Sequence, residues 1–242
     1  MLQRRVLAHA QPPAPCSYDS RNAVPQDLAT AHEAWDKNWT TASARARWLE
    51  ADPHVRTLEP LLRQRNFTRI LDVGCGIGRH AQYFASLGFS CVGIDASPSG
   101  LSFARQRATD AGLQIDYREA PFYQLPFNHQ TFGALIAWNV IYHGDAEVVQ
   151  RAIDEFSRVL VPGGLYVGSM LSKRNTSYGK GLQVRPDTFT VPDATDDKVH
   201  PHFYCDARTL LSLHRDFEVL SLQDREQSPG AYHWQFTLER QR

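Results

Sequence analysis

The chain has 242 residues with 26 basic and 26 acidic side chains, so its formal net charge at pH 7 is zero. This length predicts one domain of ordinary size with a full hydrophobic core. The charge balance argues against a nucleic-acid partner, because proteins that bind nucleic acid usually carry a basic excess. No apolar run reaches the roughly 18 residues that a membrane span needs. The four cysteines form no C-x-x-C pair, so we expect no disulfide bond and a cytoplasmic protein.

The N-terminal part of the chain divides into two regions. Residues 1–30 include Gln11-Pro12-Pro13-Ala14-Pro15 and few large apolar side chains, which predicts a flexible arm. No long apolar segment follows Arg4 and Arg5, so we expect no secretory signal. Residues 31–66 favour helix, and the prolines at positions 53 and 60 predict two or three short helices rather than one.

A glycine-rich turn follows the first predicted strand. The apolar run 70–73 leads into Gly74-Cys75-Gly76-Ile77-Gly78, and a helix is predicted over 78–87. Glycine permits positive φ and removes the Cβ atoms that would keep a ligand from the backbone. Strand, glycine turn and helix in this order form the mononucleotide-binding unit of doubly wound α/β folds.

An acidic residue at the end of the next predicted strand indicates which class of nucleotide the turn would bind. The strand predicted over 90–95 ends at Asp95, and a carboxylate there suits the two hydroxyl groups of a ribose. The turn reads G-x-G-x-G rather than the G-x-G-x-x-G of dinucleotide-binding enzymes, which disfavours an NAD-dependent oxidoreductase. No Lys-Ser or Lys-Thr pair follows the turn, which excludes a phosphate-binding P-loop.

The rest of the chain first alternates between predicted strands and helices, and then this pattern breaks. Strands that alternate with helices of this length predict an α/β fold, with a mostly parallel sheet and helices on both faces. A long polar insert follows the fifth strand, and inserts of this kind usually carry function. The predicted strands are 114–118, 132–138, 164–170, 217–223 and 232–239, the helices are 98–111, 146–159 and 206–213, and the insert is 172–201.

The glycine motif, the spaced Asp95 and the Val159-Leu160-Val161-Pro162-Gly163-Gly164 turn resemble those of class I S-adenosylmethionine-dependent methyltransferases. The resemblance runs from about Trp35 to the C-terminus. It implies a single domain over 31–242 with a Rossmann-like doubly wound sheet and an antiparallel C-terminal strand. It also implies S-adenosylmethionine as cofactor, S-adenosylhomocysteine as product, and methyl transfer by in-line displacement.

The resemblance also implies the residues of the cofactor site. Family members often place an acidic side chain at the position of Pro121, where it bonds the adenine amino group, so here backbone groups or Glu119 must replace it. The expected cofactor-binding residues are Asp72, Gly74, Cys75, Gly76, Gly78, Asp95, Ala96, Ser97, Pro121, Phe122, Trp138 and Asn139.

Two residues at the end of the fourth strand are the catalytic candidates. His143, with Tyr142 beside it, is the best candidate for a general base, because an unperturbed histidine accepts a proton near neutrality. A purely structural histidine at a strand end is the alternative interpretation.

The acceptor site is expected between the N-terminal helices and the insert. Residues 31–66 resemble a lid segment, although aromatic packing explains the same tryptophans, and the segment 172–205 is expected to line the acceptor pocket. His200, His202 and Cys205 offer zinc-binding atoms, but no fourth ligand is evident, so no metal is expected. The expected acceptor-binding residues are Trp39, Arg174, His200, His202, Tyr204 and His233.

The nature of the acceptor is left open among several classes. The ending of the chain, with Phe203-Tyr204 and His233-Trp234, loosely resembles tellurite-resistance-type and thiopurine-type methyltransferases, which implies a thiol, a chalcogen oxyanion or another small metabolite. The alternatives are an RNA or protein methyltransferase and a non-catalytic homologue that only binds the cofactor. The oligomeric state, monomer or dimer, is also open.

Overall fold

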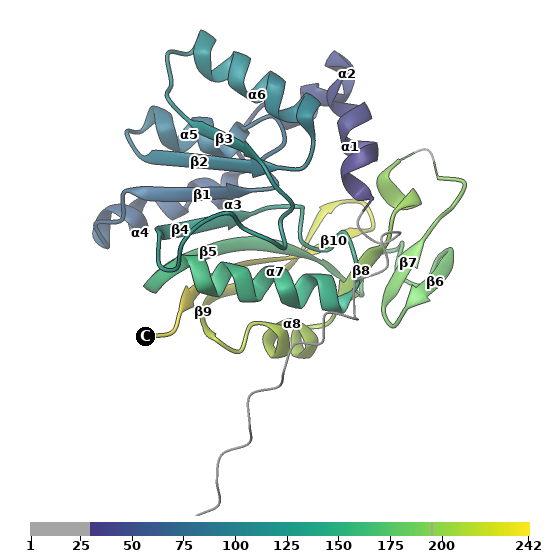
Figure 1. Ribbon diagram of the computed structural model, residues 1–242. Helices are drawn as coiled ribbons and strands as arrows, with labels where there is room; N and C mark the ends of the chain where they lie inside the picture. Colours follow the sequence, from purple (N-terminus) through teal and green to yellow (C-terminus); the bar gives the residue numbers. More distant parts are fainter. Residues whose placement is uncertain (1–29, 195) are drawn as a thin grey trace, which may run out of the picture.

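The computed structural model describes residues 30–194 and 196–242 (Figure 1). The arm expected over residues 1–30 therefore lies outside the described residues, apart from Thr30. A single sheet of ten strands crosses the described part of the chain. The strands are β1 (Arg69–Val73), β2 (Ser90–Asp95), β3 (Asp116–Glu119), β4 (Phe132–Ala137), β5 (Leu160–Ser172), β6 (Leu182–Arg185), β7 (Thr188–Thr190), β8 (His202–Cys205), β9 (Phe217–Ser228) and β10 (Ala231–Arg240).

Helices precede the sheet and connect its strands. They are α1 (Ala31–Trp39), α2 (Ala42–Arg45), α3 (Pro53–Arg56), α4 (Leu58–Gln64), α5 (Arg79–Ser86), α6 (Pro98–Asp110), α7 (Ala146–Val159) and α8 (Ala207–Leu213), with the 3₁₀ turns η2 (Ala46–Trp48) and η3 (Asp197–Val199). None of these described helices is both long and apolar enough to cross a membrane.

The strand order confirms the predicted fold class. Strands β3, β2, β1, β4 and β5 lie side by side and all pair in parallel. Strand β10 pairs antiparallel with β5, and β9 pairs antiparallel with β10. The order reverses between β1 and β4, so this is the point at which an open α/β sheet binds its ligand.

Two hydrophobic cores, one on each face of the sheet, hold the helices. Alternate residues of a strand point to opposite faces, and in β1 Leu71 belongs to one core while Ile70 belongs to the other. Helices α7 and α8 contribute to the first core and α4, α5 and α6 to the second. Helices therefore cover both faces, as Figure 1 shows.

The insert forms an extension of the sheet rather than a loop. Strands β6, β7 and β8 pair antiparallel in sequence order. Strand β8 then joins the end of β5 in parallel, with Leu171 opposite Tyr204. This pairing places the insert next to the carboxyl end of the parallel strands, close to α1 (Figure 1).

Two local predictions were wrong. Pro60 was expected to interrupt a helix, but it lies in the first turn of α4, where a missing N–H is tolerated. The Pro162-Gly163-Gly164 turn lies within β5, where the register against β4 shifts and Gly163 takes a φ of 76°.

Candidate functional site

The glycine turn between β1 and α5 is fastened to the end of β2. The N–H of Cys75 donates to the carbonyl of Ile94 at 2.9 Å. The N–H of Gly76 donates to Asp95 Oδ2 at 2.7 Å, and the N–H of Ser97 donates to Asp95 Oδ1 at 2.8 Å. The carboxylate of Asp95 is thus oriented by backbone groups before any ligand binds.

The glycines of the turn make room for protein side chains as well as for a ligand. An added Cβ at Gly76 would lie 2.9 Å from the ring of Trp39, and one at Gly78 would lie 2.2 Å from the hydroxyl of Tyr117. Gly78 also has a φ of 77° and precedes α5. The positive φ was expected from the sequence, but the close contact with Trp39 was not.

Two hydrogen bonds to Asp36 join helix α1 to the start of α6. Asp36 on α1 accepts a hydrogen bond from Ser97 Oγ at 2.7 Å and another from the Ser99 N–H at 2.8 Å. These bonds lower the pKa of Asp36, the Ser97 bond having the largest effect. Trp39 on α1 also packs against Gly100 on α6, where an added Cβ would lie 2.8 Å from the Trp39 ring.

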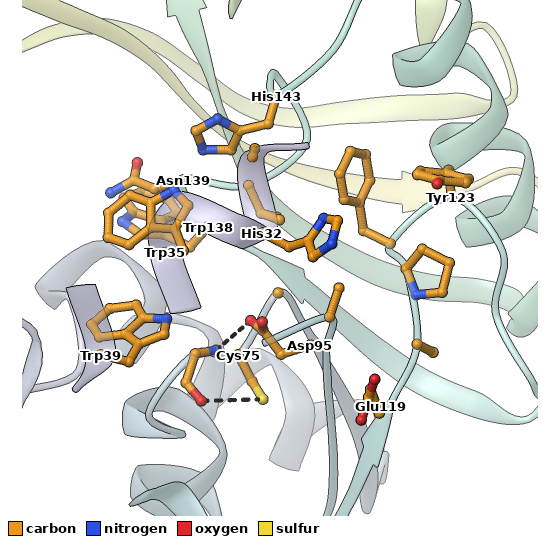
Figure 2. A pocket seen from close by; sticks show the side chains of 18 of the residues that line it. His32, Trp35, Trp39, Cys75, Asp95, Glu119, Tyr123, Trp138, Asn139 and His143 are labelled. Carbon is orange, nitrogen blue, oxygen red and sulfur yellow. Dashed lines mark hydrogen bonds between the residues drawn. The ribbon is translucent and has the colours of Figure 1, made fainter. Parts of the chain in front are cut away.

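A cavity of about 750 Å³ lies between α1, the glycine turn and the carboxyl ends of β2, β3 and β4. Figure 2 shows Trp35 and Trp39 along one side, Glu119 and Tyr123 along the other, and Asp95 between them. A volume of this size accommodates a small-molecule ligand. The predicted site residues that line it are Trp39, Gly74, Cys75, Gly76, Asp95, Ala96, Pro121, Phe122, Trp138, Asn139 and His143.

Three of the predicted cofactor residues lie beneath the cavity instead of lining it. Asp72 is buried and accepts a hydrogen bond from the Ala81 N–H in the first turn of α5, at 3.1 Å. Ser97 is the N-cap of α6, and Gly78 is the N-cap of α5. Each therefore shapes the backbone around the site.

Burial raises the pKa of Asp95, the acidic residue that faces the cavity. Desolvation raises the pKa of Asp95 to about 6, even though the bonds from Gly76 and Ser97 act in the opposite direction. A carboxylate offers about four lone-pair sites and these two bonds use two of them. Asp95 can thus accept further hydrogen bonds from a ligand.

The segment after β4 enters the cavity in an unusual backbone conformation. Asn139 has a φ of 58°. Its N–H donates to Ser169 Oγ at 2.8 Å, and that hydroxyl donates back to Asn139 Oδ1 at 2.9 Å. This exchange fixes the loop that carries Trp138 and His143.

The two catalytic candidates differ in their position. His143 lines the cavity, whereas the neighbouring Tyr142 is buried outside the lining. Burial lowers the pKa of His143 to about 3, with the nearby His202 adding to the effect. Burial raises the pKa of Tyr142 well above its usual value. His143 is therefore a weak base and Tyr142 keeps its proton, and the catalytic assignment stays a prediction.

Four of the predicted acceptor-binding residues, three near the insert and one on β10, lie outside the cavity wall. His200 contacts Thr30 through Nδ1 and Oγ1 at 2.8 Å, and Tyr204 packs against Tyr178 with ring centroids 5.7 Å apart. His202 contacts His143, and the buried His233 lies near Tyr142. None of these four lines the cavity.

Arg174 lies apart from this group. It forms an ion pair with Asp224 at 3.5 Å and covers the ring of Tyr232. Its guanidinium is therefore already engaged away from the cavity.

The three side chains that the sequence offered for zinc do not form a metal-binding group in the structure. Among the described residues, His200, His202 and Cys205 form no group that could hold a metal. Cys205 is buried, and desolvation raises the pKa of its thiol. His202 instead lies close to His143 and Asp197, two residues from other segments.

Several lining residues were not identified as site residues from the sequence. They are Thr30, His32 and Glu33 at the start of α1, Arg79 on α5, and Val148 and Arg151 on α7. Their spacing follows the ordinary amphipathic pattern of helices, so only the assembled fold could identify them.

Comparisons with known proteins show which proteins this chain resembles. Residues 70–164 match a family described as "Methyltransferase domain". Ubiquinone biosynthesis O-methyltransferase of Roseobacter denitrificans is 37% identical over 113 residues, which is 46% of this chain and 44% of that protein. The enzyme of the same name from Cereibacter sphaeroides is 35% identical over 115 residues, 47% of this chain and 45% of that protein. Residues 70–164 therefore carry a methyltransferase domain, and the chain is similar to class I S-adenosylmethionine-dependent methyltransferases.

The methyltransferase fold extends beyond the segment that matches by sequence. The 1,6-didemethyltoxoflavin-N1-methyltransferase of Burkholderia thailandensis superposes with a TM-score of 0.67, at 17% identity, over 93% of each chain. A methyltransferase from Methanosarcina mazei gives 0.66 at 20% identity, over 80% of this chain and 99% of that one. This chain spans less than half the length of the curated relatives that it matches.

Proposed function

We propose that this protein transfers a methyl group from S-adenosylmethionine to a small-molecule acceptor held in the same cavity. The observation that carries the proposal is the oriented carboxylate of Asp95, which faces the cavity at the switch point of the sheet. Two ribose hydroxyl groups could donate to its remaining lone pairs. Binding would offset the cost of keeping this carboxylate ionised in a buried place.

The surroundings of Asp95 suit the rest of the cofactor. The methionyl portion would lie along Gly74–Gly76, and the adenine would lie beside Ala96 and Phe122. Glu119 lines the cavity near Pro121, so it can take the adenine amino group in place of the missing acidic side chain. The methyl group would then point toward Asn139 and His143.

The acceptor would occupy the part of the cavity covered by α1. Trp35 and Tyr123 line opposite sides of the cavity, and their aromatic rings favour a planar acceptor. Helix α1 lines the cavity and is held in place by the hydrogen bonds of Asp36, and this cover favours a small acceptor over a macromolecule. Thiols, chalcogen oxyanions and phenolic metabolites all fit the chemistry of displacement at a sulfonium methyl group.

Catalysis would come mainly from proximity and alignment. The sulfonium charge already activates the methyl group, so a positioned nucleophile gains most of the rate enhancement. A histidine whose pKa lies near 3 stays neutral at physiological pH and removes protons poorly. His143 would therefore act by binding the acceptor more than by general-base catalysis.

The test is transfer of a labelled methyl group from S-adenosylmethionine to a panel of thiols, selenite, tellurite, phenols and catechols. The proposal expects label in a small-molecule product, with S-adenosylhomocysteine formed in equal amount. The Asp95→Ala variant should lose this activity, while Asp154→Ala, on the exposed face of α7, should keep it. Label found only in added RNA or protein would overturn the small-molecule acceptor, and cofactor binding without any product would favour a non-catalytic homologue.

A further inference from the structure

Three ligating side chains from separate segments meet at the end of the cavity that carries His143. His143 follows β4, Asp197 begins η3 and His202 begins β8. One ligand atom from each lies within 4.8 Å of the others. Backbone contacts hold the segments of the two histidines side by side. His143 and His202 form an antiparallel bridge, and the Gly144 N–H donates to the Pro201 carbonyl at 3.0 Å.

The imidazole nitrogens at this point are buried without hydrogen-bond partners. His143 is 5% exposed, and neither of its ring nitrogens has a partner among the described residues. His202 is 1% exposed, and its Nε2 makes no hydrogen bond there. Buried polar atoms are nearly always paired, so orphaned nitrogens on two touching rings point to a missing ligand.

The second ring nitrogen of His202 sets its tautomer. Nδ1 lies 2.8 Å from the His200 carbonyl oxygen, and because a carbonyl only accepts, Nδ1 must carry the proton. In the neutral ring Nε2 then holds a lone pair, 3.5 Å from Asp197 Oδ2. A lone pair and a carboxylate oxygen repel each other unless a cation or a proton lies between them. A metal-binding histidine typically has this arrangement, with its other nitrogen donating to a carbonyl.

The remaining oxygen of Asp197 has its own partner. Lys198 Nζ lies 3.7 Å from Asp197 Oδ1, so Oδ2 is the oxygen directed toward His202. The Asp197 side chain is partly exposed, which provides a route for an ion from solvent.

We propose that His143, Asp197 and His202 bind a divalent transition-metal ion. Two imidazoles and one carboxylate suit zinc and its neighbours in the first row, with metal–ligand distances of about 2.0–2.2 Å. Small rotations of the three side chains would bring atoms now within 4.8 Å to that geometry. Three protein ligands leave a coordination position open, as in catalytic zinc sites.

The place of the site gives the metal a role, which rests on the proposed methyl transfer. His143 lines the cavity, so the ion would lie at the wall of its acceptor end. The open position would take the oxygen of a hydroxyl acceptor and lower the pKa of that hydroxyl. The acceptor proton would pass to water, the oxygen would bond to the methyl carbon, and the carbon–sulfur bond would break with its electron pair left on sulfur. The products are a methyl ether, S-adenosylhomocysteine and one proton.

Zinc binding to the full-length protein tests the site without any assay of activity. Calorimetry with Zn²⁺, in competition with a chelator of known affinity, should give one ion per chain. Asp197→Asn and His202→Gln should each weaken binding by roughly 100-fold, because each removes one of three ligands. His129→Gln removes an exposed histidine that is not part of the cluster and should leave the affinity unchanged.

Cobalt provides an independent spectroscopic readout. Co²⁺ bound to the wild type should show the visible absorption of a four- or five-coordinate ion, and Asp197→Asn should lose it. If both ligand variants fail to fold, as judged by thermal melting, the stoichiometry and the Co²⁺ spectrum of the wild type decide the question. Binding of equal strength in the folded variants, or no binding by the wild type at about 100 µM Zn²⁺, would overturn the proposal.

Cofactor binding measured on the same samples separates the two proposals. Asp197 and His202 do not line the cavity, so their variants should still bind S-adenosylmethionine. A wild type that binds Zn²⁺ but not S-adenosylmethionine would overturn the proposed function and keep the metal site. If removal of Zn²⁺ from the wild type leaves methylation of every hydroxyl acceptor unchanged, the metal has no role in the reaction.

Discussion

At the cofactor end of the cavity, backbone N–H groups hold Asp95 in place, and Ser169 holds Asn139. At the acceptor end, His143 and His202 are buried with nitrogens that no described residue pairs. The first end is ordered by the fold alone, as preorganised binding sites are. The second would be completed by the metal ion that we propose there. The cofactor end can therefore be understood from local sequence, whereas the acceptor end would be complete only with a bound metal ion.

The largest effect is expected from removal of the Asp95 carboxylate. Asp95→Ala should weaken S-adenosylmethionine binding by about 100-fold or more, because it deletes the acceptor of the ribose hydroxyls and also frees the N–H groups of Gly76 and Ser97. Calorimetry measures the affinity, with Asp154→Ala as the control. An affinity within threefold of the wild type would show that the cofactor end is not organised by Asp95.

A second prediction concerns the rigidity of the glycine turn. Gly78→Ala should lower the free energy of unfolding by about 3 kcal/mol, since it forces a left-handed conformation on alanine and drives a Cβ into Tyr117. Gly112→Ala has a similar φ of 65° but open space around it, so it should cost only about 1 kcal/mol. Urea denaturation gives both values, and equal losses would mean that the contact with Tyr117 is unimportant.

The pH dependence of cofactor affinity should follow Asp95. Its pKa is raised to about 6, so the group is protonated below this pH in the ligand-free protein, and the bound ribose requires the ionised form. The affinity for S-adenosylmethionine should therefore be constant above about pH 7 and fall roughly tenfold per unit below pH 6. Calorimetry between pH 5 and 8 measures this, and Asp95→Asn should remove the step. A step of equal size in that variant would assign the titration to another group.

Weakening the hydrogen bonds between α1 and the start of α6 should have the smallest effect of these changes. Asp36→Asn keeps the shape of the side chain but weakens the bonds from Ser97 Oγ and the Ser99 N–H. Dissociation of S-adenosylmethionine should accelerate by about fivefold, because the lid would open more often. Stopped-flow fluorescence of the nearby tryptophans measures the rate. Lys37→Ala, on the exposed side of the same helix, should leave it unchanged.

The cofactor end was predictable because its signals are short-range. Three alternate glycines after a buried strand, and an acidic residue at the end of the next, specify both the turn and Asp95. The mostly parallel sheet and the antiparallel β10 followed from the alternation of elements and from the family resemblance. The wrong details were the effects of Pro60 and of the 162–164 turn, where tertiary pairing decides the local structure.

The acceptor end was not predictable in the same way, because its contacts join distant segments. Asp197 lies 54 residues from His143 in the chain, and nothing in its own neighbourhood marks it. His200, His202 and Cys205 were considered as zinc-binding side chains and set aside for want of a fourth ligand, and among the described residues they form no metal-binding group. Pairing of β8 with the end of β5 is what brings His202 to His143, and that pairing has no local signal.

The most direct test of the central claim is calorimetric titration of the wild-type protein with S-adenosylmethionine, S-adenosylhomocysteine and NAD. The geometry around Asp95 and the glycine turn predicts that the first two bind one per chain and that NAD does not bind. Binding of NAD alone, or of none of the three, would contradict the assignment of this cavity to a methyl donor.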